Sequence, residues 1–319
     1  MAFSNDVREE LINIKTDNAD IANSFLSAAI SFCGNMVFTG GGNITFYFVT
    51  ENAGVARRIV SDFKTAFSES LELYRKRNYN FTKKKIYILK YPAKKNSKDI
   101  LKKLSVLADY KGTITIRSDI DIDVVCTDER KKSFLRGAYV ASGSISNPEK
   151  SYHLEFITHS YSYARNFADL LNGVGIRSNV LERNDSYVIY VKDSESISDF
   201  LNYVGAHSSM FKLEDIRIKK QMRNDVNRLV NCESANLKKI AKTYVRQKKS
   251  IEYIIQKKSL DYLPEELREI ATLRLQNVDD SLKELADKMS EPISKSGVNH
   301  RLKKIEMIAE SLLKEEKIK

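Results

Sequence analysis

The chain has 319 residues, with 53 Lys and Arg against 42 Asp and Glu, which gives a formal charge of +11. A hydrophobic content of 42% excludes a wholly disordered protein, and the length suffices for two or three domains. No apolar run reaches the roughly 20 residues of a membrane span, and the first residues lack the pattern of a signal peptide. Cys33, Cys126 and Cys232 are too dispersed for a disulfide framework or a zinc finger. We therefore expect a soluble, cytoplasmic protein.

The positive charge leaves two classes of protein open. Surface Lys and Arg favour a polyanionic partner such as double-stranded DNA, but a Lys-rich proteome can give the same charge to a metabolic enzyme. From Lys212 to Lys319 there are 25 basic and 18 acidic residues, and this last third of the chain carries +7 of the +11. A DNA-binding site is therefore sought there first.

Residues 1–206 mix strand-like and helix-like segments and repeat themselves. A strand at 44–50 and a helix at 55–67 match a strand at 152–158 and a helix at 164–171. Phe48 and Phe156 share the offset of 108 with Ala56 and Ala164. Second strands are predicted at 86–91 and 187–191, and closing helices at 98–107 and 197–204. The fold class is therefore α+β, with a pseudo-symmetric tandem αββαββα domain.

Each repeat opens with a helix of small residues, at 25–34 and 134–143. Ala28, Gly137 and Ala141 would let two helix backbones approach closely, and Gly34 and Gly143 would cap the helices. The plain interpretation is a buried helix pair. The residues at the polar positions of the two helices decide whether the pair could also form a catalytic site.

These two helices resemble the LAGLIDADG motif of homing endonucleases. In that family an acidic residue at the penultimate motif position binds the catalytic divalent metal. The same position here falls on Cys33 and Ser142, neither of which offers the anionic oxygen that Mg²⁺ prefers. The resemblance therefore implies the fold and argues against cleavage, with Cys33 and Ser142 as degenerate former metal positions.

No other pattern supports an enzyme. The four His are scattered, so no metal site is expected, and no cofactor or catalytic residue is assigned. Gly40-Gly41-Gly42 lacks the ending of a phosphate-binding loop and favours a tight hairpin. Asp121, Asp123 and Asp128 lie outside the motif, and they keep open a residual nuclease with rearranged ligands.

The last third is predicted to be helical throughout, and its first feature is a polar stripe. Asn224, Asn227 and Asn231 share one helix face with Arg223 and Arg228 nearby. Asn is a poor helix former, so these amides indicate hydrogen-bonding duties. Two interpretations remain open. The amides either bridge elements of the protein, or the stripe contacts DNA phosphates through Arg223, Asn227 and Arg228.

A helix-turn-helix is predicted downstream. Ser281 and Glu284 form a capping box ahead of an apolar stripe, the chain breaks near 291–294, and a third helix starts at Lys295. Val298, Leu302 and Ile305 face the core. The positions predicted to contact DNA are Ser281, Lys295, Ser296, Asn299, His300, Arg301, Lys303 and Lys304. An ordinary helical hairpin with a solvated basic face is the alternative. The stretch from Leu263 to Ile305 also resembles region 4 of sigma factors.

A degenerate LAGLIDADG pair followed by a helix-turn-helix resembles the WhiA family of bacterial regulators. The segments that carry this resemblance are 3–11, 136–148, 223–236 and 294–302. The resemblance implies a DNA-binding protein of Gram-positive bacteria, located at the nucleoid and linked to cell division, chromosome segregation or sporulation. The LAGLIDADG-like part could contact DNA through Lys83, Lys84, Lys85, Lys94 and Lys95, or bind another regulator or a division protein.

The predicted organisation is a LAGLIDADG-like domain at 1–206, with repeats at about 1–110 and 128–206. A connecting helical segment follows at 207–235, and the helix-turn-helix domain occupies 236–319 with its motif at about 281–305. The favoured function is a sequence-specific transcription regulator without enzymatic activity. A nucleoid-associated or division scaffold that binds DNA nonspecifically is the alternative, and a homing endonuclease is the third.

Overall fold

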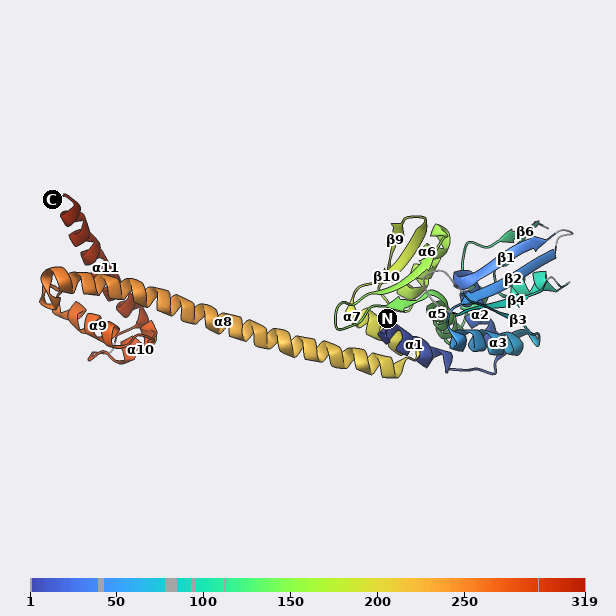
Figure 1. The fold of residues 1–319 in the computed structure, drawn as a ribbon, viewed down its shortest axis with the longest axis horizontal. Helices are drawn as coiled ribbons and strands as arrows, with labels where there is room; N and C mark the ends of the chain where they lie inside the picture. Colours follow the sequence, from blue (N-terminus) through green and yellow to red (C-terminus); the bar gives the residue numbers. More distant parts are fainter. Residues whose placement is uncertain are drawn as a thin grey trace. The chain divides into compact units, whose positions relative to one another are not determined.

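The computed structural model describes residues 2–39, 43–77, 85–92, 94, 96–111, 113–291 and 293–318. It divides into two compact units, Met1–Lys219 and Lys220–Lys319 (Figure 1). Helix α8 (His207–Lys258) runs without interruption through the predicted limit between 235 and 236. The predicted domain limits themselves remain predictions. Among the described helices, none is long and apolar enough to cross a membrane.

The first unit contains two four-stranded antiparallel sheets of the same topology, so the predicted pseudo-symmetry is confirmed. Their strand orders are β1-β2-β4-β3 and β7-β8-β10-β9, which correspond strand for strand. The first sheet comprises β1 (Gly34–Thr39), β2 (Asn43–Thr50), β3 (Glu72–Arg77) and β4 (Lys85–Tyr91). The second comprises β7 (Ser144–Ile145), β8 (Leu154–Thr158), β9 (Asn179–Arg183) and β10 (Ser186–Val191).

Helices pack on one face of each sheet because the strands alternate buried and exposed side chains. Phe46 and Phe48 on β2 and Phe156 on β8 point into a continuous core. The helices that cover these residues are α2 (Ala19–Cys33), α3 (Ala53–Phe67), α4 (Ser97–Lys103), α5 (Asp128–Ser142), α6 (Tyr161–Gly173) and α7 (Ser194–Val204). Each repeat therefore has the predicted αββαββα order.

Helices α2 and α5 pack against each other through small residues, as predicted. A Cβ at Gly137 would lie 2.2 Å from the backbone oxygen of Phe25, a distance that no side chain tolerates. Gly34 and Gly143 do cap the two helices, but both have extended backbone with negative φ. A Cβ at Gly34 would lie 2.3 Å from the Ile30 oxygen. Close approach to the preceding turn, and not a left-handed conformation, therefore favours glycine there.

Two sequence-based boundaries are wrong. The helix predicted over 98–107 ends at Lys103, because the chain turns through Ser105 at φ 57° and Leu107 begins the hairpin of β5 (Leu107–Tyr110) and β6 (Thr113–Ile116). The strand predicted from 152 begins at Leu154. The hairpin predicted at Gly40-Gly41-Gly42 lies outside the described residues, as do Lys83, Lys84 and Lys95.

An N-terminal helix, α1 (Ala2–Ile12), joins elements of the first unit that are distant in sequence. The Glu10 carboxylate accepts hydrogen bonds from the Ser208 and Ser209 backbone nitrogens at 2.8 and 3.0 Å, at the start of α8. Lys212 forms an ion pair with Asp6 at 2.7 Å. This helix therefore fixes the first turns of α8 on the LAGLIDADG-like fold.

The second unit is helical, as predicted. The C-terminal turns of α8 pack on a cluster formed by η3 (Leu260–Tyr262), α9 (Glu265–Gln276), α10 (Leu282–Asp287) and α11 (Lys295–Ile318). Ile251 and Ile254 of α8 are fully buried in that cluster. Pro264 is the N-cap of α9 and precedes its first turn.

Candidate nucleic-acid interface

The predicted capping box starts α10. Ser281 Oγ accepts from the Glu284 backbone nitrogen at 3.3 Å, and the Glu284 carboxylate accepts from the Ser281 nitrogen at 2.7 Å. The helix has only six residues and ends at Asp287, so Met289 is buried in the turn and not on the helix. The turn to α11 is therefore longer than the sequence suggested, and Glu269 of α9 accepts a 2.6 Å hydrogen bond from the Ser290 nitrogen within it.

Helix α11 starts at Lys295 because Ser294 satisfies its first backbone donors. Ser294 Oγ accepts from the Gly297 nitrogen at 3.2 Å. Val298, Leu302 and Ile305 are fully buried against α9 and α10, as their spacing predicted. The first three turns of α11 are thereby fixed with one face to the core and the other to solvent.

The solvent face of these turns carries the predicted donors. Lys295, His300 and Lys303 are exposed, and Asn299 and Arg301 are half-buried. None of these five side chains forms a hydrogen bond or an ion pair with another described residue. Ser296 is exposed, with its Oγ 2.7 Å from Ser294 Oγ, and Ser281 is half-buried in its capping role. The arrangement therefore presents unpaired donors and amides around one half of α11.

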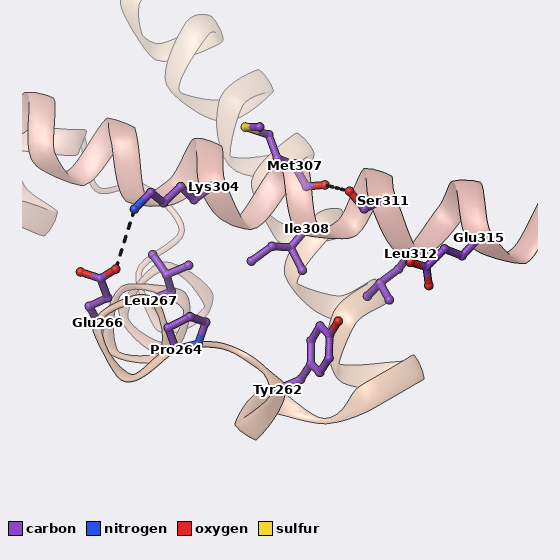
Figure 2. Close-up of a pocket in the computed structure, with 10 residues that line it drawn as sticks. All are labelled: Tyr262, Pro264, Glu266, Leu267, Lys304, Met307, Ile308, Ser311, Leu312 and Glu315. Carbon is purple, nitrogen blue, oxygen red and sulfur yellow. Dashed lines mark hydrogen bonds and ion pairs between the residues drawn. The ribbon is translucent and has the colours of Figure 1, made fainter.

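Lys304 differs from the other predicted contacts. Its Nζ lies 3.9 Å from the carboxylate of Glu266 on α9, above an open groove of about 410 Å³ (Figure 2). Leu267, Ile308 and Leu312 line that groove together with Tyr262. Lys304 thus lies at the edge of the predicted DNA-binding surface next to α9, and Glu266 partly neutralises its charge.

Sequence reasoning missed the buried arginine that holds the corner between α9 and α10. Arg274 is 1% exposed, with its guanidinium 5.0 Å from the centre of the Tyr244 ring. It donates to the backbone carbonyl oxygen of Asp280 at 2.6 Å, and burial lowers its pKa. Lys288 also pairs with Asp280, at 2.7 Å. No local sequence motif predicts this contact, because Tyr244 lies thirty residues upstream on α8.

The polar stripe of α8 lies in solvent. Arg223, Asn227 and Arg228 are exposed, like every residue from 221 to 239. Within the described part of the chain, these three side chains make no hydrogen bond or ion pair. Both interpretations of the stripe, a bridge between elements of the protein and a contact with phosphates, therefore remain open.

At the former motif positions, both side chains are turned to the strands. Ser142 Oγ accepts from the Ile157 nitrogen of β8 at 3.1 Å. Burial raises the pKa of the Cys33 thiol to about 12, an effect partly offset by a hydrogen bond from the Val49 backbone of β2. Arg8 of α1 donates to the Gly143 oxygen at 2.7 Å, directly after Ser142. A fixed cation thus stands at the end of the second motif helix.

The neighbouring acids are engaged in contacts of their own. Asp121 pairs with Arg117 at 2.7 Å, and Asp128 accepts from the Tyr203 hydroxyl at 2.6 Å. Asp123 is exposed. Across the described ranges, no group of three His, Cys, Asp or Glu side chains could hold a metal ion.

Comparison with known proteins shows which family has this architecture. The chain matches three family models: the WhiA N-terminal LAGLIDADG-like domain over residues 22–107, the WhiA LAGLIDADG-like domain over 131–223 and the WhiA C-terminal HTH domain over 226–309. A protein of Clostridium acetobutylicum named Probable cell division protein WhiA is 44% identical over 315 residues, which cover 99% of each chain. The chain belongs to the WhiA family. The resemblance drawn from the motifs is therefore confirmed.

Further WhiA relatives agree along the whole chain. A protein of Clostridium perfringens with the same name is 43% identical over 312 residues and 98% of each chain. The crystal structure of full-length WhiA from Thermatoga maritima is 25% identical, with a TM-score of 0.57 and 96% of each chain covered. The two sheets, the paired motif helices and the HTH module described above are therefore the WhiA fold.

Proposed function

We propose that this WhiA-family chain is a non-enzymatic, sequence-specific DNA-binding regulator. It acts on double-stranded DNA at the nucleoid, in the cytoplasm of a Gram-positive bacterium, on genes of cell division, chromosome segregation or sporulation. The name shared by its relatives, Probable cell division protein WhiA, supports the link to division.

One observation carries the proposal. The buried face of α11 is held by Val298, Leu302 and Ile305, so its opposite face presents a set of side chains without partners in the described chain. Asn299 suits adenine and Arg301 suits guanine, while Lys295 and Lys303 suit phosphates. Ser281, Ser296, His300 and Lys304 complete this surface as flanking contacts. Its charge and its position at the start of the second HTH helix match major-groove readout.

Alanine variants of α11 test this assignment. Asn299→Ala and Arg301→Ala should each cost about 1–3 kcal/mol against the preferred operator and relax its sequence preference. Lys303→Ala should weaken binding to every sequence and reduce the slope of log K against log salt by about 0.9. Lys314→Ala, an exposed Lys beyond the motif on the same helix, is the matched control. Unchanged affinity and sequence preference in all three variants would contradict the assignment of α11 as the DNA-recognition helix.

Arg223, Asn227 and Arg228 are proposed to add phosphate contacts from α8. Their exposure supports this role, because no described residue competes for them. Replacing Arg228 with Ala should lower affinity without changing sequence preference. A change in preference would contradict a phosphate role.

The absence of DNA cleavage is proposed on the geometry of the motif helices. Cys33 is a half-buried neutral thiol, Ser142 bonds to β8, and Arg8 places a positive charge where a divalent cation would need negative oxygens. Incubation with operator DNA and Mg²⁺ or Mn²⁺ should leave the DNA intact. Site-specific cuts that vanish in Asp121→Ala or Asp123→Ala would overturn the proposal.

The positions that the protein occupies on the chromosome distinguish a regulator from a nucleoid or division scaffold that binds DNA nonspecifically. Discrete peaks near promoters in a genome-wide occupancy map support regulation, whereas a diffuse profile supports the scaffold. In either case the LAGLIDADG-like part is proposed to bind another regulator or a division protein. Of the lysines suggested for DNA contact there, Lys94 already pairs with Glu69 at 3.1 Å.

A further inference from the structure

The exposed stretch of α8 has an apolar stripe that no other described element of the second unit covers. Its members recur at helical spacing and are 52–65% exposed: Met222, Val226, Leu229, Val230 and Leu237. At 3.6 residues per turn they share one side of the helix, and Asn227, Arg228 and Asn231 lie on the other. Soluble proteins seldom leave such a row of large apolar side chains in water unless a partner covers it.

Two charged residues lie along this stripe. Arg223 and Glu233 are both exposed, and neither forms an ion pair with any residue that the structure describes. Glu233 has no basic residue three or four positions away, and Arg223 has no acidic one, so neither can pair along the helix. They are ten residues apart, which is about 15 Å along α8 and too far for them to meet each other.

We propose that a second copy of this chain covers the stripe as an antiparallel α8 pair. With the two-fold axis at the level of Arg228, Arg223 of each copy faces Glu233 of the other in the DNA-free protein, and Val226 faces Val230. DNA phosphates would compete with Glu233 for the same Arg223. Twofold symmetry makes each contact twice. A parallel pair would instead bring the two Glu233 carboxylates together inside an apolar seam, which is unfavourable. Charge complementarity therefore selects the antiparallel copy.

The expected dimer is weak. A fully buried aliphatic side chain removes about 60–120 Å² from water at 25 cal/mol per Å². Five partly exposed side chains from each copy, with their charged flanks, form an interface near or below the lower end of the roughly 1,200–2,000 Å² that stable complexes bury. The monomer should therefore be visible on dilution, and the dimer should appear as the concentration rises.

Sedimentation equilibrium on the full chain without DNA tests the proposal, over about 1–200 µM. The wild type should shift from monomer to dimer across that range. Leu229→Asp should remain monomeric, whereas Asn231→Asp, which adds a similar charge on the opposite side of the same helix, should dimerise like the wild type. Circular dichroism confirms that each variant stays helical, as expected for exposed positions. A wild type that is monomeric throughout, or equal behaviour of the two variants, overturns the proposal.

Charge reversal tests the antiparallel geometry. Arg223→Glu and Glu233→Arg each turn two attractive contacts into repulsive ones and should weaken the dimer about tenfold or more. The double variant should recover the wild-type constant, because each copy then offers the same pair with the signs exchanged. Failure to recover would refute this pairing. The measurement needs no DNA, so its outcome is independent of the proposed regulatory function.

Discussion

The close approach of the two motif helices can be tested at Gly137. Its missing side chain leaves room for the backbone oxygen of Phe25, which lies 2.2 Å from where a Cβ would stand. Gly137→Ala must therefore move α5 away from α2 inside a core where neighbouring side chains are fully buried. Because the obstacle is backbone, it cannot rotate aside as a flexible side chain would.

The expected loss follows from two opposing effects. Overpacking a core costs about 1–3 kcal/mol, and a clash with backbone belongs at the upper end. Alanine gains about 1 kcal/mol over glycine in a helix interior. The net loss is then about 2 kcal/mol, which corresponds to a fall of about 4–8 °C in the Tm of a unit of this size.

Scanning calorimetry of the full chain measures this change in the transition of the first unit. Gly173→Ala is the matched control, since Gly173 ends α6 with no atom within 4 Å of its added Cβ. The control should be neutral or gain up to about 1 kcal/mol. If Gly137→Ala melts as high as Gly173→Ala, the two motif helices are not in backbone contact at this point, and the packing argument fails.

Three further changes probe other contacts. Glu10→Ala should cost about 0.5–2 kcal/mol and speed hydrogen exchange at Ser208 and Ser209, because it removes the acceptors at the start of α8; unchanged exchange would contradict the cap. The raised pKa of Cys33 leaves it as a neutral thiol at pH 8, so mass spectrometry should find iodoacetamide on exposed Cys126 and Cys232 well before Cys33; equal labelling would refute burial. Arg274→Ala should destabilise the second unit by about 3 kcal/mol in urea unfolding, because it leaves the Asp280 backbone oxygen without a donor and a cavity beside Tyr244. A loss below 1 kcal/mol, within the range of an ordinary surface change, would argue against the contact between Arg274 and Asp280.

Local signals in the sequence predicted the elements whose causes are local. The capping box at Ser281, the buried positions Val298 and Leu302, and the repeat offset that aligns β2 with β8 all depend on residues close together in the chain. The same reasoning placed the end of the fourth helix too far along, because helix propensity continues past Lys103 while Ser105 turns the chain. Boundaries of this kind are decided by tertiary packing, which propensity does not contain.

Contacts between distant segments could not be read in this way. Arg274 looks like a surface residue of a charged helix until α8 brings Tyr244 over its guanidinium. Arg8 and Glu10 are likewise ordinary charges of a short helix, yet one contacts the end of α5 and the other the start of α8. At these places the sequence shows only composition, and composition cannot specify a partner thirty or more residues away.

The ends of the two motif helices show why Cys33 and Ser142 suit this architecture. A carboxylate at the end of a motif helix faces the negative end of the helix dipole, so without a bound cation it would be destabilising. Replacing it by Cys33 or Ser142 removes that repulsion, and both side chains find backbone partners on β2 and β8. Arg8 then supplies the positive charge that the helix end favours, through its bond to the Gly143 oxygen. The N-terminal helix thus stabilises the end of the second motif helix with its own positive charge, and the proposed absence of DNA cleavage rests on this arrangement.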